Sequence, residues 1–308
     1  MEVKDIVNFN STKNMLGELK LLTRSSNTEK TYLKGLVSFV NTMNITNLDE
    51  LVSNIKNGST DSSEIYKNFV LNLANKNFAP KTVGAWSASV KKFFSANGIE
   101  LKHTIPVKMY NVHEDKLPSR EELKNILKIC NLRTKTIILL MSSSGLRIGE
   151  LRELKVEDVD LESVPAKVRI KGITAKERKS RITFISNEAK EALQSYINTR
   201  KNNGHQLTPE SALFTTNSGT KMSYQNLQFI MNNIFKKISK KEGKRYEIHP
   251  HSLRKFFKTQ LIAAGVPGPI VDRLTGHSRY MSQEYELYTE EQLKEWYLKG
   301  MKNLELMN

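Results

Sequence analysis

Residues 136–151 read TIILLMSSSGLRIGEL. This stretch predicts two helices joined by a turn. The apolar run Thr136–Met141 is typical of a buried helix. Gly145 can end that helix, because glycine adopts the left-handed backbone conformation without steric cost. Leu146–Leu151 then begins a second helix, which places Arg147 at the turn between the two.

Other segments around this turn predict further helices and one β-hairpin. Ser119–Glu122 forms a capping box that opens a helix. Residues 168–171 and 181–185 alternate between apolar and polar side chains, as half-buried strands do, and a basic loop over residues 172–180 joins them. Residues 224–238 have helical spacing again. We therefore predict a mainly helical fold with a small antiparallel β-sheet, which is an α+β fold.

The first hundred residues predict a separate helical domain. Residues 1–22 are expected to be a polar lead-in with one short amphipathic stretch. Over residues 23–103, apolar side chains recur at helical spacing and no strand is indicated. Residues 104–116 contain Pro106 and show no period, so they predict a linker before the next domain.

Charge favours nucleic acid as the partner. The chain has 308 residues and a net charge of +16. Residues 1–100 carry 12 Lys and Arg against 9 Asp and Glu, a net charge of +3, so the remaining +13 lies in the rest of the chain. Such a field attracts polyanions more than small acidic metabolites.

Cysteine usage and hydropathy restrict the compartment. Cys130 is the only cysteine, so the chain can form no intrachain disulfide and no cysteine-based zinc site. No apolar run approaches the roughly 18–20 residues that span a membrane, and the N-terminus lacks a signal-peptide pattern. We expect a cytoplasmic protein with no membrane partner.

Four polar clusters, far apart in the chain, share one chemistry. Arg147 follows the glycine turn, His251 and Arg254 are three residues apart and so face the same way on one helix, and His277 follows a glycine. Residues 285–288 begin and end with tyrosine. Guanidinium groups match phosphate oxygens, histidines move protons near neutral pH, and a tyrosine oxygen can attack phosphorus.

This ordered set resembles the tyrosine recombinase (integrase) family, whose pattern is Arg…Lys…His-x-x-Arg…His/Trp…Tyr. The match runs from Ser142 to Tyr288, whereas the first third of the chain matches only in size and helical character. The resemblance implies a core-binding domain over residues 23–103 and a catalytic domain over residues 117–288. It also implies a site-specific recombinase of double-stranded DNA that works through a 3′-phosphotyrosyl intermediate, without metal, ATP or other cofactor. Among such enzymes, the chain looks closest to integrases of mobile elements or viruses, archaeal ones included.

The resemblance assigns a role to each matched position. It implies that Arg147 and Arg254 clamp the phosphate, and that His251 and His277 donate hydrogen bonds to its oxygens or move protons. Glu150 corresponds to a supporting residue. The glycine before His277 is expected to let the backbone approach DNA closely.

The family's lysine lies on a β-hairpin turn, about five residues before an arginine that starts the second strand. Counting back from Arg181 gives Lys176, which the resemblance implies is the acid that protonates the leaving 5′ oxygen. Lys171 and Lys179 are then expected to contact phosphates. Further DNA contacts are expected from the basic end of the helix over residues 224–238, at Lys236, Lys237, Lys240 and Lys241.

The choice of nucleophile stays open at this point. Tyr285 lies eight residues after His277 and Tyr288 eleven, and neither spacing matches the family's common one. Context favours Tyr285, because Tyr288 then takes an apolar position before Thr289, which can cap a helix. Tyr288 is the alternative nucleophile. The other tyrosines that follow are Tyr280 and Tyr297.

Residues 289–308 predict a C-terminal helix. A capping box at Thr289–Gln292 precedes an apolar stripe at helical spacing. Tails of this kind in the family often pack on a neighbouring subunit, so we expect docking on a partner within a tetramer on DNA, with docking on its own domain as the alternative.

Two other functions use the same residues. One is relaxation of supercoiled DNA by a type IB topoisomerase, and the other is DNA binding without catalysis.

Overall fold

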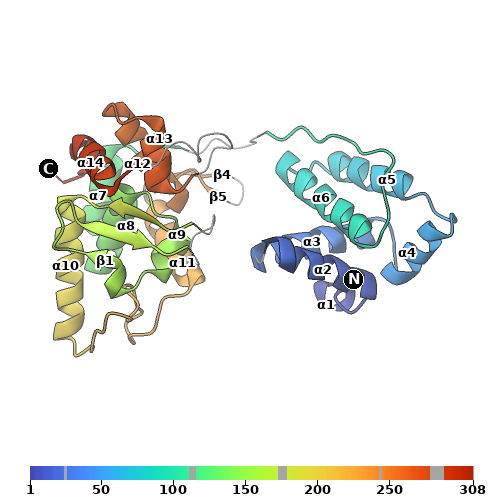
Figure 1. Cartoon of the computed structure of the whole chain (residues 1–308), viewed down its shortest axis with the longest axis horizontal. Helices are drawn as coiled ribbons and strands as arrows, with labels where there is room; N and C mark the ends of the chain where they lie inside the picture. The colour runs from blue at the N-terminus through green and yellow to red at the C-terminus, as the bar shows by residue number, and fades with distance from the viewer. Residues whose placement is uncertain (24–25, 111–115, 173–178, 243–244, 278–287, 308) are drawn as a thin grey trace. The chain divides into compact units, whose positions relative to one another are not determined.

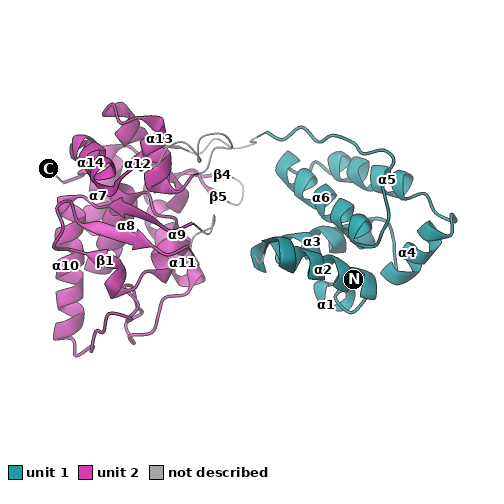
Figure 2. Cartoon of the chain, in the orientation of Figure 1, with its two compact units in different colours: residues 1–114 teal, residues 115–308 magenta. Residues whose placement is uncertain are grey.

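A computed structural model describes the chain except residues 24–25, 111–115, 173–178, 243–244, 278–287 and 308. The chain forms two compact units, Met1–Glu114 and Asp115–Asn308 (Figures 1 and 2). The division falls inside the linker predicted over residues 104–116.

Among the described residues, no helix is both long enough and apolar enough to cross a membrane.

Unit 1 is helical throughout its described part. Its helices are α1 (Val3–Ile6), α2 (Asn10–Thr23), α3 (Ser26–Thr42), α4 (Leu48–Lys56), α5 (Ser62–Asn75) and α6 (Pro80–Ala96). Phe39 of α3 packs edge-on against Phe69 and Phe94, with ring centroids 5.2 and 5.9 Å apart. Gly35 lets α3 approach α6 closely, since a Cβ there would lie 2.7 Å from the Cβ of Ser89.

The segment expected to be a polar lead-in belongs to this unit. Residues 1–22 lie largely in α1 and α2, which place Ile6, Met15 and Leu19 in the core of unit 1. The prediction was wrong because these helices bury only a narrow apolar face, so most of their residues are polar.

Unit 2 surrounds a small sheet with helices. Its helices are α7 (Arg120–Ile129), α8 (Leu132–Ser144), α9 (Ile148–Glu153), α10 (Asn187–Asn202), α11 (Tyr224–Phe235), α12 (Pro250–Ala263), α13 (Gly268–Thr275) and α14 (Glu290–Leu304), with a 3-10 turn at Val156–Asp158. Its strands are β1 (Val159–Asp160), β2 (Lys167–Ile170), β3 (Arg181–Phe184), β4 (Lys241–Glu242) and β5 (Arg245–Tyr246). The predicted α+β fold is confirmed.

The sheet contains the predicted hairpin. Strands β1, β2 and β3 are antiparallel in that order, with Val168 opposite Thr183. A separate pair, β4 and β5, follows α11. Sequence patterns did not predict β1, β4 or β5, because a two-residue strand has no alternation to detect.

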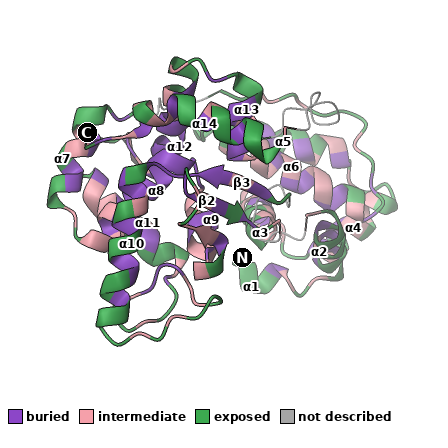
Figure 3. Ribbon diagram, turned by 60° about the vertical axis from the view of Figure 1, so that its left-hand side comes forward, coloured by how far each residue is buried: buried purple, intermediate pink, exposed green. Residues whose placement is uncertain are grey.

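Helix α8 lies at the centre of unit 2. Ten of its thirteen residues are buried, and it packs against α10, α12, α14 and β3. Half of the residues of α12 and three of the four in β3 are also buried (Figure 3). The predicted stop at Gly145 is confirmed, because Gly145 is left-handed at φ 67° and its N–H bonds to the Met141 carbonyl.

Helix α14 packs on its own domain. The predicted capping box at Thr289 is confirmed, and Leu293, Tyr297 and Leu304 are buried in a cluster with Phe257 of α12. Within the single chain, the tail takes the alternative placement, on its own domain.

Two side chains hold the last turn of α14 and the residues that follow it. The Arg120 guanidinium donates to the carbonyls of Lys302 and Glu305 at 2.8 and 2.6 Å. The buried Glu188 carboxylate accepts from the backbone N–H groups of Leu306 and Met307 at 2.7 and 2.6 Å. The end of the chain is thereby tied to the first turns of α7 and α10.

Candidate active site

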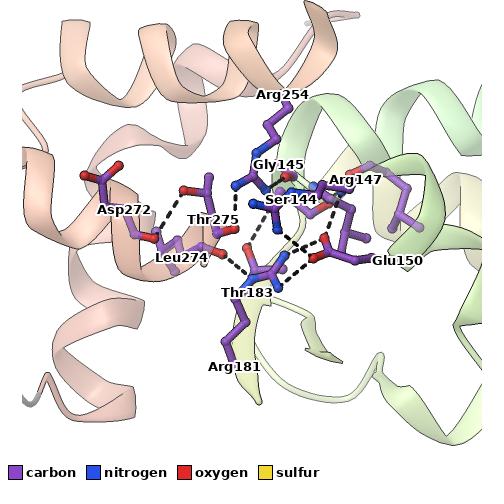
Figure 4. Close-up of polar contacts among 12 residues, drawn as sticks. Ser144, Gly145, Arg147, Glu150, Arg181, Thr183, Arg254, Asp272, Leu274 and Thr275 are labelled. Carbon is purple, nitrogen blue, oxygen red and sulfur yellow. Dashed lines mark hydrogen bonds and ion pairs between the residues drawn. The ribbon is translucent and has the colours of Figure 1, made fainter. Parts of the chain in front are cut away.

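Arg254 of α12 lies between two helix ends that carry other candidate residues (Figure 4). Its Nη1 donates to the Gly145 carbonyl and its Nη2 to the Thr275 carbonyl, both at 2.6 Å. Gly145 comes two residues before Arg147, and Thr275 comes two residues before His277. A single buried guanidinium therefore fixes both segments relative to α12.

Helices α8 and α13 end in the same way. Each stops at a left-handed glycine, Gly145 at φ 67° and Gly276 at φ 62°. The last carbonyls of a helix lack partners within the helix and carry partial negative charge. Arg254 accordingly satisfies two such carbonyls with a cation, which is the favourable sign of charge at a helix C-terminus.

Other elements satisfy the neighbouring carbonyls of α8. The Tyr297 hydroxyl of α14 donates to the Ser143 carbonyl at 2.8 Å. The Thr183 hydroxyl of β3 donates to the Ser144 carbonyl at 2.9 Å (Figure 4). The turn before Arg147 is thus held by side chains from α12, α14 and β3, which makes its geometry a product of the tertiary fold.

Glu150 connects Arg147 to a second buried arginine. Its carboxylate accepts from the Arg147 backbone N–H at 2.9 Å and from Arg147 Nη1 at 3.0 Å. Arg181 of β3 donates to both carboxylate oxygens, at 3.0 and 2.7 Å, and its Nε donates to the Leu274 carbonyl at 3.1 Å (Figure 4). Burial acts to raise the pKa of Glu150, but the contacts with Arg181 and Arg147 outweigh burial and lower that pKa below its usual range. Glu150 is therefore ionised and holds the Arg147 side chain and backbone.

Sequence reasoning missed the role of Arg181, which served only as the position from which the lysine was counted. Its side chain is 4% exposed, and it links the Arg147 turn to the end of α13. The alternation of the strand gave no signal for it, because the apolar side chains Ile182 and Phe184 have the opposite parity to residue 181. Strand β3 is buried on both faces, and a buried arginine requires a partner anion.

Arg181 also explains the glycine before His277. A Cβ on Gly276 would lie 2.8 Å from Arg181 Cδ and 3.0 Å from its Nε. The expected reason for this glycine was close approach to DNA. In the structure, the space above Gly276 is filled by Arg181, so the glycine is needed for the packing of unit 2 itself.

The two candidate histidines are both exposed. His251 lies in the first turn of α12, with its ring centroid 6.2 Å from that of His249. His277 follows α13, and its N–H donates to the Asp272 carbonyl at 2.9 Å. Partial loss of solvent and the nearby Lys258 cation lower the pKa of His277 below its ordinary value, which favours the neutral imidazole.

Arg254 keeps its charge despite its burial. The side chain is almost fully enclosed, and burial together with the Arg147 cation lowers the pKa of Arg254 to about 9. The guanidinium is still protonated at pH 7. Within the described ranges, no three His, Cys, Asp or Glu side chains are grouped in a way that could hold a metal ion.

Lys176 and Tyr285, the predicted acid and nucleophile, lie outside the described residues. The alternative nucleophile Tyr288 is half-buried and packs against the core cluster of α12–α14. It also lines a pocket together with Ile182, Arg181 and Arg273.

The other lysines with expected phosphate contacts differ in their surroundings. Lys171 pairs with Glu157 at 2.6 Å and Asp158 at 3.2 Å, and these hydrogen bonds raise the pKa of Lys171. Its charge is thus already compensated within the protein, whereas Lys179 is exposed. The exposed lysines that follow α11 are Lys236, Lys237, Lys240 and Lys241.

Known proteins share this sequence and fold. The family model for the phage integrase family matches residues 118–294. The tyrosine recombinase XerA of Pyrococcus horikoshii is 28% identical over 300 residues, covering 96% of this chain and 94% of the relative. The tyrosine recombinase XerC of Haemophilus ducreyi is 35% identical over 148 residues, which are 48% of this chain and 45% of the relative.

A solved structure shows the same fold over nearly the whole chain. The integrase of the Tn1549 transposon, in complex with transposon right-end DNA, aligns over 92% of this chain and 97% of its own at a TM-score of 0.64 and 18% identity. The family match spans more than half of the chain and includes the turn of Arg147, the His251–Arg254 pair and His277. This chain therefore belongs to the phage integrase family of tyrosine recombinases.

Proposed function

We propose that this enzyme is a site-specific recombinase that cuts and rejoins double-stranded DNA through a 3′-phosphotyrosyl intermediate. The bracing of Arg254 between Gly145 and Thr275 carries the proposal, because it brings the segments of Arg147 and His277 together. Two guanidinium groups and an imidazole offer the donors that the oxygens of one phosphate accept.

Stabilisation of charge is the main task of such a site. Attack on a DNA phosphate increases the negative charge on the oxygens around phosphorus, and donors that are already in place stabilise it without reorganising. Arg254 uses two of its five N–H groups for helix carbonyls, so three are not engaged by described residues. Glu150 and Arg181 hold Arg147 in place from the opposite side.

The remaining roles rest on the family resemblance. The Tyr285 oxygen attacks phosphorus while its proton passes to a histidine of the site, and the bond from phosphorus to the 5′ oxygen breaks. Lys176 gives a proton to that leaving oxygen, because an alkoxide leaves poorly. His251 and His277 donate to the nonbridging oxygens. A 5′ hydroxyl from a second duplex then attacks the phosphotyrosyl bond, so the bond energy is kept and no ATP or other cofactor is needed.

Charge and relatives support DNA as the partner. The net charge of +13 after residue 100 and the exposed lysines after α11 provide a surface for a polyanion. The Tn1549 integrase structure named above contains transposon DNA, and XerH, a further structure of this fold, is bound to its difH substrate. We propose a homotetramer on DNA as the assembly that exchanges strands, and mobile-element integration as the setting.

Covalent capture tests the proposal. The protein is incubated, in EDTA and without ATP, with a library of random duplexes that carry a nick. The nick releases the fragment that bears the 5′ hydroxyl and so traps the protein on the DNA. We expect an adduct that survives SDS, with the linked peptide carrying DNA at Tyr285. Tyr285→Phe should abolish the adduct, and Tyr288→Phe is the matched control.

Each other result changes the conclusion. An adduct at Tyr288 would move the alignment of this segment by one helical turn. A protein that binds the selected DNA but never forms an adduct would contradict catalysis. Relaxed plasmid without recombinants from two captured sites would indicate a type IB topoisomerase.

A further inference from the structure

An ion pair that the proposed mechanism does not use connects the two helices of the candidate site. Lys258 lies on α12, four residues and so one helical turn after Arg254. Its Nζ is 2.7 Å from Oδ1 of Asp272 on α13, and the two side chains are only 27% and 17% exposed. The pair therefore links the helix that carries Arg254 to the helix that ends at His277.

Asp272 contacts the His277 segment through its backbone as well. Its carbonyl accepts from the His277 N–H at 2.9 Å and from the Thr275 hydroxyl at 3.2 Å. The carboxylate thus binds α12 while the carbonyl of the same residue fixes the turn that holds His277. A change in the ion pair would act directly on the position of the imidazole.

The described charges around His277 are mostly positive. Lys258 and Arg254 come from α12 and Arg147 from the turn before α9, and the one described anion is Asp272 of α13. Arg181 of β3 lies against Gly276, but its charge is paired with Glu150. A further positive charge on the imidazole is therefore disfavoured while no phosphate is bound.

We propose that Lys258 and Asp272 are positioning residues for His277: their ion pair fixes the end of α13, and the Lys258 cation disfavours a further positive charge on the imidazole until a DNA phosphate arrives. A phosphate anion adds negative charge beside Lys258, Arg254 and Arg147, and this charge favours the imidazolium form of His277. The imidazolium has two N–H donors, whereas the neutral ring has one, so the histidine becomes the better donor only when substrate is in place. The inference rests on the proposed function, because that function supplies the phosphate.

Substitutions of Lys258 and Asp272 should change the pKa of His277 in opposite directions, which distinguishes the proposed role from simple packing of α12 on α13. Lys258→Met removes a cation near His277, so the pKa of His277 should rise. Asp272→Asn leaves Lys258 unpaired, so the pKa of His277 should fall. If the ion pair only held α12 to α13, both variants would shift the imidazole titration in the same direction or leave it unchanged.

NMR titration of the His277 ring in the full-length protein tests this order. The signal is assigned by its absence in His277→Gln. We expect the lowest titration midpoint in Asp272→Asn, a higher one in the natural protein and the highest in Lys258→Met. The double variant should lie between the two single variants. Lys258→Arg should restore the natural midpoint, and Lys294→Met on the exposed face of α14 is the matched control. Thermal unfolding of each variant shows whether it is folded.

A second measurement adds a DNA duplex at low salt to Tyr285→Phe, which cannot cleave if that assignment holds. The His277 midpoint should move up on binding, and by less in Lys258→Met, where it starts higher. Equal midpoints in the single variants, or no change on DNA binding, would overturn the inference. Because the titration needs no cleavage, failure of covalent capture would contradict the proposed function without deciding this test.

Discussion

Arg181 and Glu150 form a buried ion pair on which the Arg147 turn depends. Their side chains are 4% and 2% exposed. Removing one partner of such a pair costs about 3–5 kcal/mol when the other charge is left uncompensated. In Arg181→Met, Glu150 keeps its contacts with Arg147, so we expect the free energy of unfolding in urea to fall by up to this amount. The double variant Arg181→Met/Glu150→Gln buries no new charge and should recover part of the loss, so equal losses would argue against charge as the cause.

The Glu150 carboxylate also predicts that the free energy of unfolding depends on pH. Contacts with Arg181 and Arg147 lower the pKa of Glu150 in the folded protein, although burial opposes them. Glu150 therefore binds a proton more readily in the unfolded chain than in the folded protein. Its contribution to stability is complete above the pKa of the unfolded state and is lost as pH falls through the lower pKa of the folded state. Below about pH 5, the unfolding free energy of the natural protein should therefore fall more steeply than that of Glu150→Gln. Glu295→Gln, on the exposed face of α14, should keep the natural slope.

Residues of the site differed in how far the sequence could predict them. Arg147, His251 and Arg254 stand in short motifs that set their local geometry, and the structure places the two arginines at one site. Arg181 has no such motif, because its partners Glu150 and Leu274 lie 31 and 93 residues away. Beside a basic loop it resembles a surface cation, and only the tertiary fold shows that it is buried.

Among the structural elements, the turn between α8 and α9 is the most sharply constrained. Gly145 is left-handed, and a Cβ there would lie 2.5 Å from Phe257 Cδ1. Gly265 is also left-handed, but a Cβ there would meet nothing within 4 Å. Left-handed backbone costs an alanine about 1–2 kcal/mol, and overpacking adds about 1–3 kcal/mol. Gly145→Ala should thus destabilise more than Gly265→Ala in thermal or urea unfolding, and equal losses would mean that Phe257 moves aside freely.

Helices and their caps were predictable because their signals are local. The capping boxes at Ser119 and Thr289 formed as expected, since each needs only residues three positions apart. Strands β1, β4 and β5 were not, because a two-residue strand is defined by its partner and not by its own pattern. Local sequence signals also could not predict where α14 packs, because its apolar stripe could fit a groove on a partner subunit as well as one on its own domain.

At the scale of the whole molecule, the C-terminal tail over residues 289–308 is part of unit 2, which carries the candidate active site. Tyr297, Leu304 and Leu306 are buried, and the Tyr297 hydroxyl supports the carbonyl of Ser143 next to the Arg147 turn. We expect removal of the residues after Gly300 to lower the melting temperature and to weaken single-site DNA binding and synapsis together. Met307→Gln, at a partly exposed position, is the control. Loss of synapsis alone, with the melting temperature unchanged, would instead favour docking on a partner.

Arg120 gives this arrangement a mechanical consequence. It begins α7, five residues after the start of unit 2, and it grips the carbonyls at the end of α14. Tension applied through the linker therefore reaches the last helix of the chain before it reaches α8 or the sheet. In an optical trap that pulls on residue 115 and the C-terminus, the first rupture should be the peeling of α14, and Arg120→Gln should lower the force at which it occurs. A first rupture with the length of the whole unit would show that the load spreads evenly through the core.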